Sequence, residues 1–126
     1  MSVQPSLYEK LGGAPAVEKA VEIFYRKVLA DPRVNHFFEG VDMEKQIAKQ
    51  RAFMTMAFGG PNEYTGRNMR EAHERLVKEK GLNDTHVDVI IEHLRSTLEE
   101  LGVAPELIEE VIQGVESLRD EVLGRA

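Results

Sequence analysis

The chain has 126 residues, of which 16 are basic and 22 acidic, so its net charge is -6. This length suits one domain with a core of its own, so we expect residues 1–126 to form a single domain. The acidic balance argues against nucleic acid as the partner. Because the chain has no cysteine, disulfides, thiolate metal sites and a cysteine nucleophile are excluded.

Apolar residues recur at helical spacing almost throughout the chain, and glycine or proline separates the segments. Asp42 can cap the helix that runs to Phe58, and Asn83 or Asp84 can cap the helix that Gly102 ends. No segment alternates as a strand does, so the pattern predicts an all-α fold. The predicted helices lie around residues 7–11, 17–29, 42–58, 69–77, 87–101 and 105–122, with a tight segment at 34–38.

The helix predicted over residues 42–58 places polar side chains where an apolar face is expected. At steps of about 100°, Gln46 and Gln50 fall inside the apolar arc with Phe53, and Lys49 lies at its border. A buried amide needs a hydrogen-bond partner, and a buried ammonium needs more than that. The pattern favours a solvated helix edge, but it also fits polar groups that face a cavity holding a polar ligand.

Tyr25 and His73 are the other two residues with open interpretations. Tyr25 follows Phe24 on an apolar stripe, where it is either a core residue, which the pattern favours, or one that directs its hydroxyl into a pocket. His73 lies between Met69 and Val77 on an apolar stripe, where a core histidine is more common than a ligand. The chain lacks the zinc-hydrolase, phosphate-loop and nucleophile-elbow motifs.

The first residues, Met1 to Pro5, have neither a basic end nor an apolar stretch, so they do not resemble a secretory signal. No run of the chain approaches the roughly 18 apolar residues of a membrane span. By elimination, we expect a cytoplasmic protein with no membrane partner.

A set of short motifs gives a more specific signal. They are Leu7-Tyr-Glu-Lys-Leu-Gly-Gly13, Phe24-Tyr25, His36-Phe-Phe38, the Gln46-to-Gln50 region, Phe58-Gly-Gly-Pro61, Tyr64-Thr-Gly66 and Met69-Arg-Glu-Ala-His73. In the order and separation of these motifs, the chain resembles the group I truncated haemoglobins along nearly its whole length. The similarity is greatest to the bacterial and cyanobacterial kind.

This resemblance implies a shortened globin, in which two helices stack over two and haem b lies between them. His73 matches the proximal iron ligand, as is usual in globins, and Phe38 matches a phenylalanine that packs on the haem face. Tyr25, Gln46 and Gln50 match a polar cage on the distal side, whose donors can hold bound dioxygen and slow its release.

Other residues are candidates for contact with the haem. Lys45 and Arg67 are weaker candidates, for pairing with the propionates. The remaining candidate haem contacts, most of them apolar, are Phe24, Phe37, Phe53, Met54, Met69, Leu76, His86, Val87, Ile90 and Leu94.

Two departures from the family pattern affect the iron and the haem. Some cyanobacterial members have a histidine that binds the sixth iron position where this chain has Lys49, and a neutral lysine amine could bind there reversibly. The alternative is a lysine that reaches a propionate or water. Some relatives also have a late histidine bonded to the haem, but this chain has none after His93. We therefore expect non-covalent haem.

The resemblance implies a monomer that binds dioxygen, nitric oxide and carbon monoxide. Plain oxygen binding or storage is one activity. Nitric oxide dioxygenation is the other, and it needs a separate reductase because the chain has no flavin or nicotinamide fingerprint. The competing hypothesis is a haem-free helical interaction module, which predicts no Soret absorption band.

Overall fold

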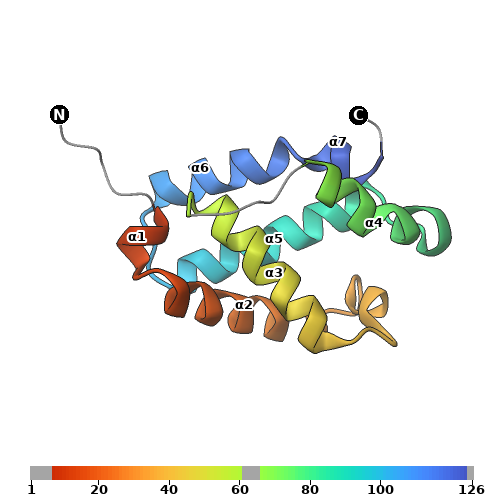
Figure 1. Cartoon of the computed structure of the whole chain (residues 1–126), viewed down its shortest axis with the longest axis horizontal. Helices are drawn as coiled ribbons and strands as arrows, with labels where there is room; N and C mark the ends of the chain where they lie inside the picture. Colours follow the sequence, from red (N-terminus) through yellow and green to blue (C-terminus); the bar gives the residue numbers. More distant parts are fainter. Residues whose placement is uncertain (1–6, 61–65, 125–126) are drawn as a thin grey trace.

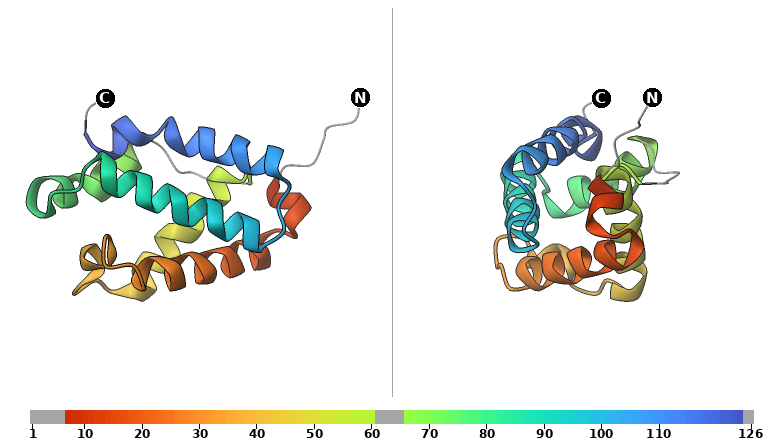
Figure 2. Two further views of the ribbon diagram at one scale, coloured as in Figure 1. Left: turned by 180° about the vertical axis from the view of Figure 1, so that it is seen from behind. Right: turned by 90° about the vertical axis from the view of Figure 1, so that its left-hand side faces the viewer.

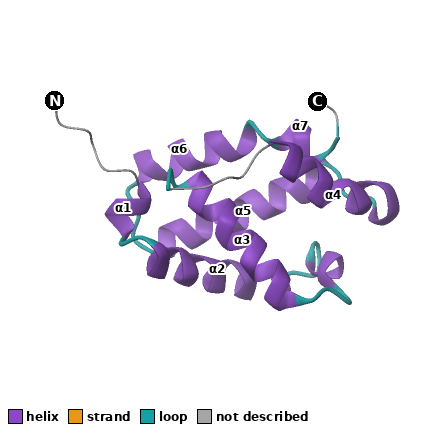
Figure 3. Cartoon of the chain, in the orientation of Figure 1, coloured by secondary structure: helices purple, strands orange, loops and turns teal. Residues whose placement is uncertain are grey.

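The computed structural model describes residues 7–60 and 66–124 of the chain. These residues form helices joined by turns and loops, with no strand among them (Figure 3). The all-α prediction is confirmed. The helices are α1 (Leu7–Leu11), α2 (Ala14–Leu29), the 3-10 helix η1 (Asn35–Phe38), α3 (Met43–Ala57), α4 (Gly66–Lys80), α5 (Asp84–Glu100), α6 (Pro105–Glu116) and α7 (Arg119–Val122).

Helices α2 and α3 form one pair and α5 and α6 form a second, and the two pairs share one core. Helix α2 packs on both α3 and α5, and α5 packs on α6. In the end-on view of Figure 2, α5 and α6 lie on one side, α3 lies on the other, and α2 connects the two. Helix α4 lies at one end of this assembly with α7 (Figure 1). No helix among the described residues is long and apolar enough to cross a membrane.

The core is built from the apolar stripes that the sequence pattern identified. Burial of such stripes supplies the main driving force for folding. Met54 and Leu98 are the largest side chains with no exposed surface. The other fully or almost fully buried residues of α2, α5 and α6 include Val17, Ala20, Val21, Phe24, Val28, Val87, Leu94, Ile108, Val111 and Ile112.

Two side-chain caps fix the starts of α3 and α5. The Oδ1 atom of Asp42 accepts hydrogen bonds from the backbone N–H groups of Glu44 and Lys45, at 3.1 and 3.4 Å. Asn83 caps α5 by accepting from the N–H of Thr85 at 2.9 Å. Such caps satisfy backbone donors that have no partner within the helix. The structure therefore confirms Asp42 as a cap and selects Asn83 over Asp84.

The prediction of one continuous last helix up to Val122 is wrong. Helix α6 ends at Glu116, and α7 begins at Arg119. The Ser117 hydroxyl donates to the Gly114 carbonyl at 2.6 Å, and serine side chains that bond to nearby backbone compete with helix continuation. The chain therefore turns before α7.

Helix α1 is held against the end of α3. The backbone N–H of Tyr8 donates to the Phe58 carbonyl at 2.9 Å. The Tyr8 ring also lies over Gly60, where an added Cβ would come within 2.7 Å of ring atoms. Only glycine leaves room for this close approach, which explains one glycine of the second Gly-Gly pair.

Candidate functional site

Tyr25 and Gln46 meet where the end of α2 crosses the start of α3. Tyr25 is buried, with 5% of its surface exposed. The Gln46 Nε2 amide donates a hydrogen bond to the Tyr25 hydroxyl oxygen at 3.1 Å. Gln50 lies one turn further along α3 and is half-buried. The structure thus brings Tyr25 and Gln46 together, and it satisfies the amide that the helical pattern marked as unusual.

Aromatic rings fix the position of Tyr25. Its ring packs edge-on against Phe24 and Phe38, with centroids 5.4 and 5.6 Å apart, which is a favoured geometry for aromatic pairs. Phe38 is half-buried at the end of η1, whereas Phe37 is buried and contacts the His86 ring. These contacts leave the Tyr25 ring little freedom, so its hydroxyl occupies a defined place beside α3.

His73 lies on α4 and is half-buried. Its neighbours at helical spacing, Leu76 and Val77, are half-buried too and pack against the core. An imidazole between apolar side chains fits both an iron ligand and a core histidine. The partly exposed state of these three residues means that this face of α4 is not fully covered by other protein atoms.

Residues 6–124 match the family model described as bacterial-like globin. The chain is 52% identical to the group 1 truncated hemoglobin of Synechocystis over 122 residues, which covers 95% of this chain and 98% of that protein. The chain belongs to the group 1 truncated haemoglobins.

Solved structures give the same result for the fold. The 2/2 hemoglobin of a Synechococcus species, in the cyanomet state and with covalently attached heme, superposes with a TM-score of 0.89 at 55% identity, covering 96% of this chain and all of that one. The Fe(III) form of truncated hemoglobin from Tetrahymena pyriformis gives 0.82 at 49% identity, covering 94% of this chain and 98% of that one. The two-over-two arrangement is confirmed, and haem-based ligand binding follows from the family.

The residues of this truncated haemoglobin fit a haem in their chemistry. Half-buried apolar side chains come from η1, α3, α4 and α5, and an apolar macrocycle would cover surface that they now leave open. One imidazole and one pair of hydrogen-bonding side chains accompany them, as a haem site needs. The half-buried apolar residues are Phe38, Ile47, Leu76, Val77 and Ile90.

Other candidate haem contacts lie deeper in the molecule. Met54 is fully buried, and the others have 8% or less of their surface exposed. These side chains belong to the core that α2, α3 and α5 share, so their contact with haem stays a prediction. They are Phe24, Phe37, Phe53, Met54, Val87 and Leu94.

His86 has a structural role at the start of α5. Its Nδ1 atom accepts a hydrogen bond from the Asn83 backbone N–H at 3.2 Å and completes a capping box. The sequence pattern showed His86 in a first turn but gave no sign of this bond. Its contact with haem stays a prediction.

Lys45 and Lys49 are both exposed on α3, and no hydrogen bond or ion pair involves either side-chain ammonium within the described part of the chain. Arg67 and Met69 are in α4, but their side chains lie outside the described residues. The predicted roles of these four residues at the haem stay predictions.

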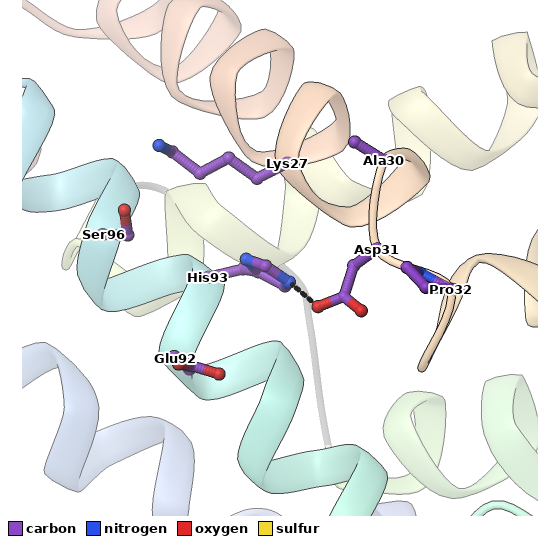
Figure 4. A pocket seen from close by; sticks show the side chains of 7 residues that line it. All are labelled: Lys27, Ala30, Asp31, Pro32, Glu92, His93 and Ser96. Carbon is purple, nitrogen blue, oxygen red and sulfur yellow. Dashed lines mark hydrogen bonds and ion pairs between the residues drawn. The ribbon is translucent and has the colours of Figure 1, made fainter.

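Sequence reasoning missed a polar network between α2 and α5. The Nε2 atom of His93 lies 2.7 Å from Oδ2 of Asp31, and their side chains are only 15% and 10% exposed (Figure 4). Two nitrogens of Arg33 donate hydrogen bonds to the same carboxylate, Nη2 at 2.7 Å and Nε at 3.1 Å. The Arg33 guanidinium, with help from His93, holds the pKa of Asp31 well below its ordinary value.

Asp31 and His93 line an open surface cavity of ≈ 470 Å³ together with Lys27, Glu92 and Ser96 (Figure 4). No group of three or more histidine or acidic side chains suited to a metal ion occurs among the described residues. The Asp31–His93 contact joins the segment that follows α2 to α5. The only early sign of it was that His93 lies off the main apolar stripe of its helix.

Proposed function

We propose that this truncated haemoglobin holds haem b non-covalently through His73 and reversibly binds dioxygen, nitric oxide and carbon monoxide as a monomer. The observation that carries the proposal is the buried Tyr25 hydroxyl in hydrogen-bond contact with the Gln46 amide. A pair made of a buried tyrosine and a half-buried amide, beside half-buried apolar side chains, suits a small polar ligand better than it suits an apolar core.

In this proposal, the side chains have separate roles. When bound, the haem supplies an iron that takes a diatomic ligand. The His73 imidazole holds the haem in place from α4. The Tyr25 hydroxyl and the Gln46 amide offer hydrogen-bond donors to a ligand that carries partial negative charge. Phe38 and the half-buried aliphatic residues exclude water from the haem surface, which strengthens these hydrogen bonds.

An absorption spectrum tests the proposal. The chain purified with haem available should show a Soret band, and acidified butanone should extract all of the haem because no covalent bond holds it. His73→Ala should lose or strongly alter the band. His93→Ala, which removes a histidine that contacts Asp31 and is not among the predicted haem contacts, should keep it. A parent protein without a Soret band would favour the haem-free interaction module instead.

Lys49 stays a predicted sixth ligand of the iron. Its side chain is exposed in the structure and makes no ion pair within the described residues. No protein contact therefore has to break before the amine turns inward, although it must lose its proton. Ferric and ferrous spectra of Lys49→Ala test this role, with Lys19→Ala on α2 as the control for loss of an exposed lysine that has no predicted contact with the haem. Unchanged six-coordinate low-spin spectra in Lys49→Ala would refute it.

Conversion of nitric oxide also stays a prediction. We propose that a separate reductase would supply the electrons, since the sequence contains no flavin or nicotinamide fingerprint. Nitrate yield from the oxygenated ferrous protein, measured over repeated additions of nitric oxide with a reductant present, separates this activity from plain oxygen binding. A single turnover without recovery would indicate that binding is the main role.

A further inference from the structure

Helix α4, which carries His73, is attached to the molecule differently from the other long helices. Helices α2, α3, α5 and α6 pack extensively on one another, whereas the one extensive helix contact of α4 within the described residues is with α7. Figure 1 shows α4 beside the short α7 at one end of the molecule. The position of α4 therefore depends on how α7 is held.

Arg119 holds α7 in place through three acidic residues. Its Nη1 atom contacts Asp84 Oδ1 at 3.1 Å and the Asp84 carbonyl at 3.2 Å. Its Nη2 atom contacts Asp88 Oδ1 at 2.5 Å and Glu116 Oε1 at 2.6 Å, and its Nε atom contacts Glu116 Oε2 at 3.0 Å. One guanidinium thus ties α7 to the start of α5 and to the end of α6.

This contact is stronger than an ordinary surface ion pair. The Arg119 side chain is only 16% exposed, and Glu116, followed by Asp88 and Asp84, raises its pKa further above the ordinary value. Charge-assisted bonds with paired geometry are among the strongest hydrogen bonds in proteins. Lysine cannot reproduce them, because an ammonium lacks the planar fork of donors.

The other side of α7 contacts α4 close to His73. Oε2 of Glu121 accepts a hydrogen bond from Nη2 of Arg70 at 3.0 Å. Arg70 precedes His73 by three residues on the same helix, so it lies one turn away. Leu118 and Val122, half-buried on either side of Arg119, pack against the core and support α7.

We infer that Arg119 and Glu121 form a clasp that positions α4, and through it the His73 imidazole, relative to α5 and α6. Both are positioning residues, because they touch neither iron nor ligand but act through α4. The inference rests on the proposed function in one respect, namely that His73 is the iron ligand. The competing interpretation is a staple that stabilises the whole fold equally.

Two measurements on matched variants separate these interpretations. Arg119→Ala opens the clasp, and Arg119→Lys keeps only its charge. Arg75→Ala is the control on α4, because it removes an exposed ion pair with Glu79 that lies within α4 and does not involve α7. Arg95→Ala is the control between helices, because it removes the α5–α6 pair with Glu109.

Hydrogen–deuterium exchange on the purified protein is the first measurement and needs no haem. Arg119→Ala should speed amide exchange in α4 about tenfold and leave α2 and α3 near their parent rates, because local opening follows local contacts. Both controls should exchange like the parent. An equal increase in every helix, or α4 rates matching those of Arg75→Ala, would overturn the inference.

The second measurement is made on the haem-loaded protein. Arg119→Ala should release haem to an apoprotein acceptor about tenfold faster, because a less firmly held α4 opens more often and takes His73 away from the iron. The iron–histidine stretching band of the ferrous form should shift or broaden, and Arg119→Lys should restore neither property fully. A merely structural staple would lower thermal stability without moving this band.

Glu121→Gln keeps the test decisive if Arg119→Ala does not fold. Glu121→Gln weakens only the link to Arg70. It should raise the amide exchange rate of α4 and the rate of haem release about threefold each, since a single partly exposed ion pair contributes less. A parent that binds no haem would overturn the proposed function, whereas faster α4 exchange in Arg119→Ala would still support the clasp. A haem-loaded parent whose clasp variants behave like the controls would overturn the clasp alone.

Discussion

Replacing Tyr25 with phenylalanine removes a single oxygen atom from a buried site. The ring contacts with Phe24 and Phe38 persist in Tyr25→Phe, while the 3.1 Å hydrogen bond from Gln46 is lost. A neutral hydrogen bond contributes about 1 kcal/mol net to stability. Because Gln46 is only half-buried, its amide can turn to water after the bond is lost. The free energy of unfolding of the haem-free protein should fall by about 1 kcal/mol.

A double-mutant cycle with Gln46→Ala isolates this bond. Urea unfolding of the parent, both single variants and the double variant should give a coupling energy of about 1 kcal/mol between the two positions. In the haem-loaded protein, loss of a donor to a partly charged ligand removes about 1.5–3 kcal/mol, so dioxygen should dissociate roughly 10–100-fold faster from Tyr25→Phe. Stopped-flow replacement of dioxygen by carbon monoxide measures that rate.

Tyr8→Phe is the control, because it removes a tyrosine hydroxyl on α1, outside the predicted site. It should leave the dioxygen dissociation rate at the parent value. A coupling energy near zero, together with an unchanged dissociation rate in Tyr25→Phe, would refute the idea that the Tyr25–Gln46 pair faces the ligand.

Two other predictions concern stability. Gly60→Ala should cost about 1–3 kcal/mol in urea unfolding, because the new Cβ would lie 2.7 Å from the Tyr8 ring and 2.9 Å from Thr55 Cγ2. The cost should be smaller in a Tyr8→Ala background, where only the Thr55 contact remains, and an equal cost in both backgrounds would contradict the packing argument. Arg33 holds the pKa of Asp31 below its ordinary 3.8, so the ion pair stabilises the protein fully above that pH, and its contribution declines as the pH falls towards the folded value. The melting temperature of Asp31→Asn should therefore lie below that of the parent at pH 6, with a gap that narrows below about pH 4. A gap of the same size at pH 6 and pH 3 would contradict this reasoning.

The sequence allowed the helices to be placed because their signals are local. Amphipathic spacing and the caps at Asp42 and Asn83 depend on residues within one or two turns, and the structure confirms both caps. The break between α6 and α7 was missed because the apolar stripe continues across it. The Ser117 hydroxyl bond to Gly114 and the fastening of Arg119 decide where that helix ends.

The site could be predicted only in part, because its contacts join distant segments. The helical pattern marked Gln46 as unusual, but it could not name Tyr25, 21 residues away, as its partner. Only the family resemblance put the two together. The Asp31–His93 contact spans 62 residues and exists because α2 packs on α5, which no local pattern reveals. Likewise, the border position of Lys49 did not show whether its ammonium faces protein or solvent.

The attachment of α4 to α7 also bears on how the protein is made. During synthesis, α4 leaves the ribosome before α7, which lies roughly 40 residues later, or a few seconds at ordinary translation rates. Throughout that interval the helix that carries His73 lacks its main packing partner in the described fold. The α2–α3 half of the molecule can already be assembled by then. Haem capture should therefore follow release of the C-terminal segment, which makes cofactor loading a late step in biosynthesis.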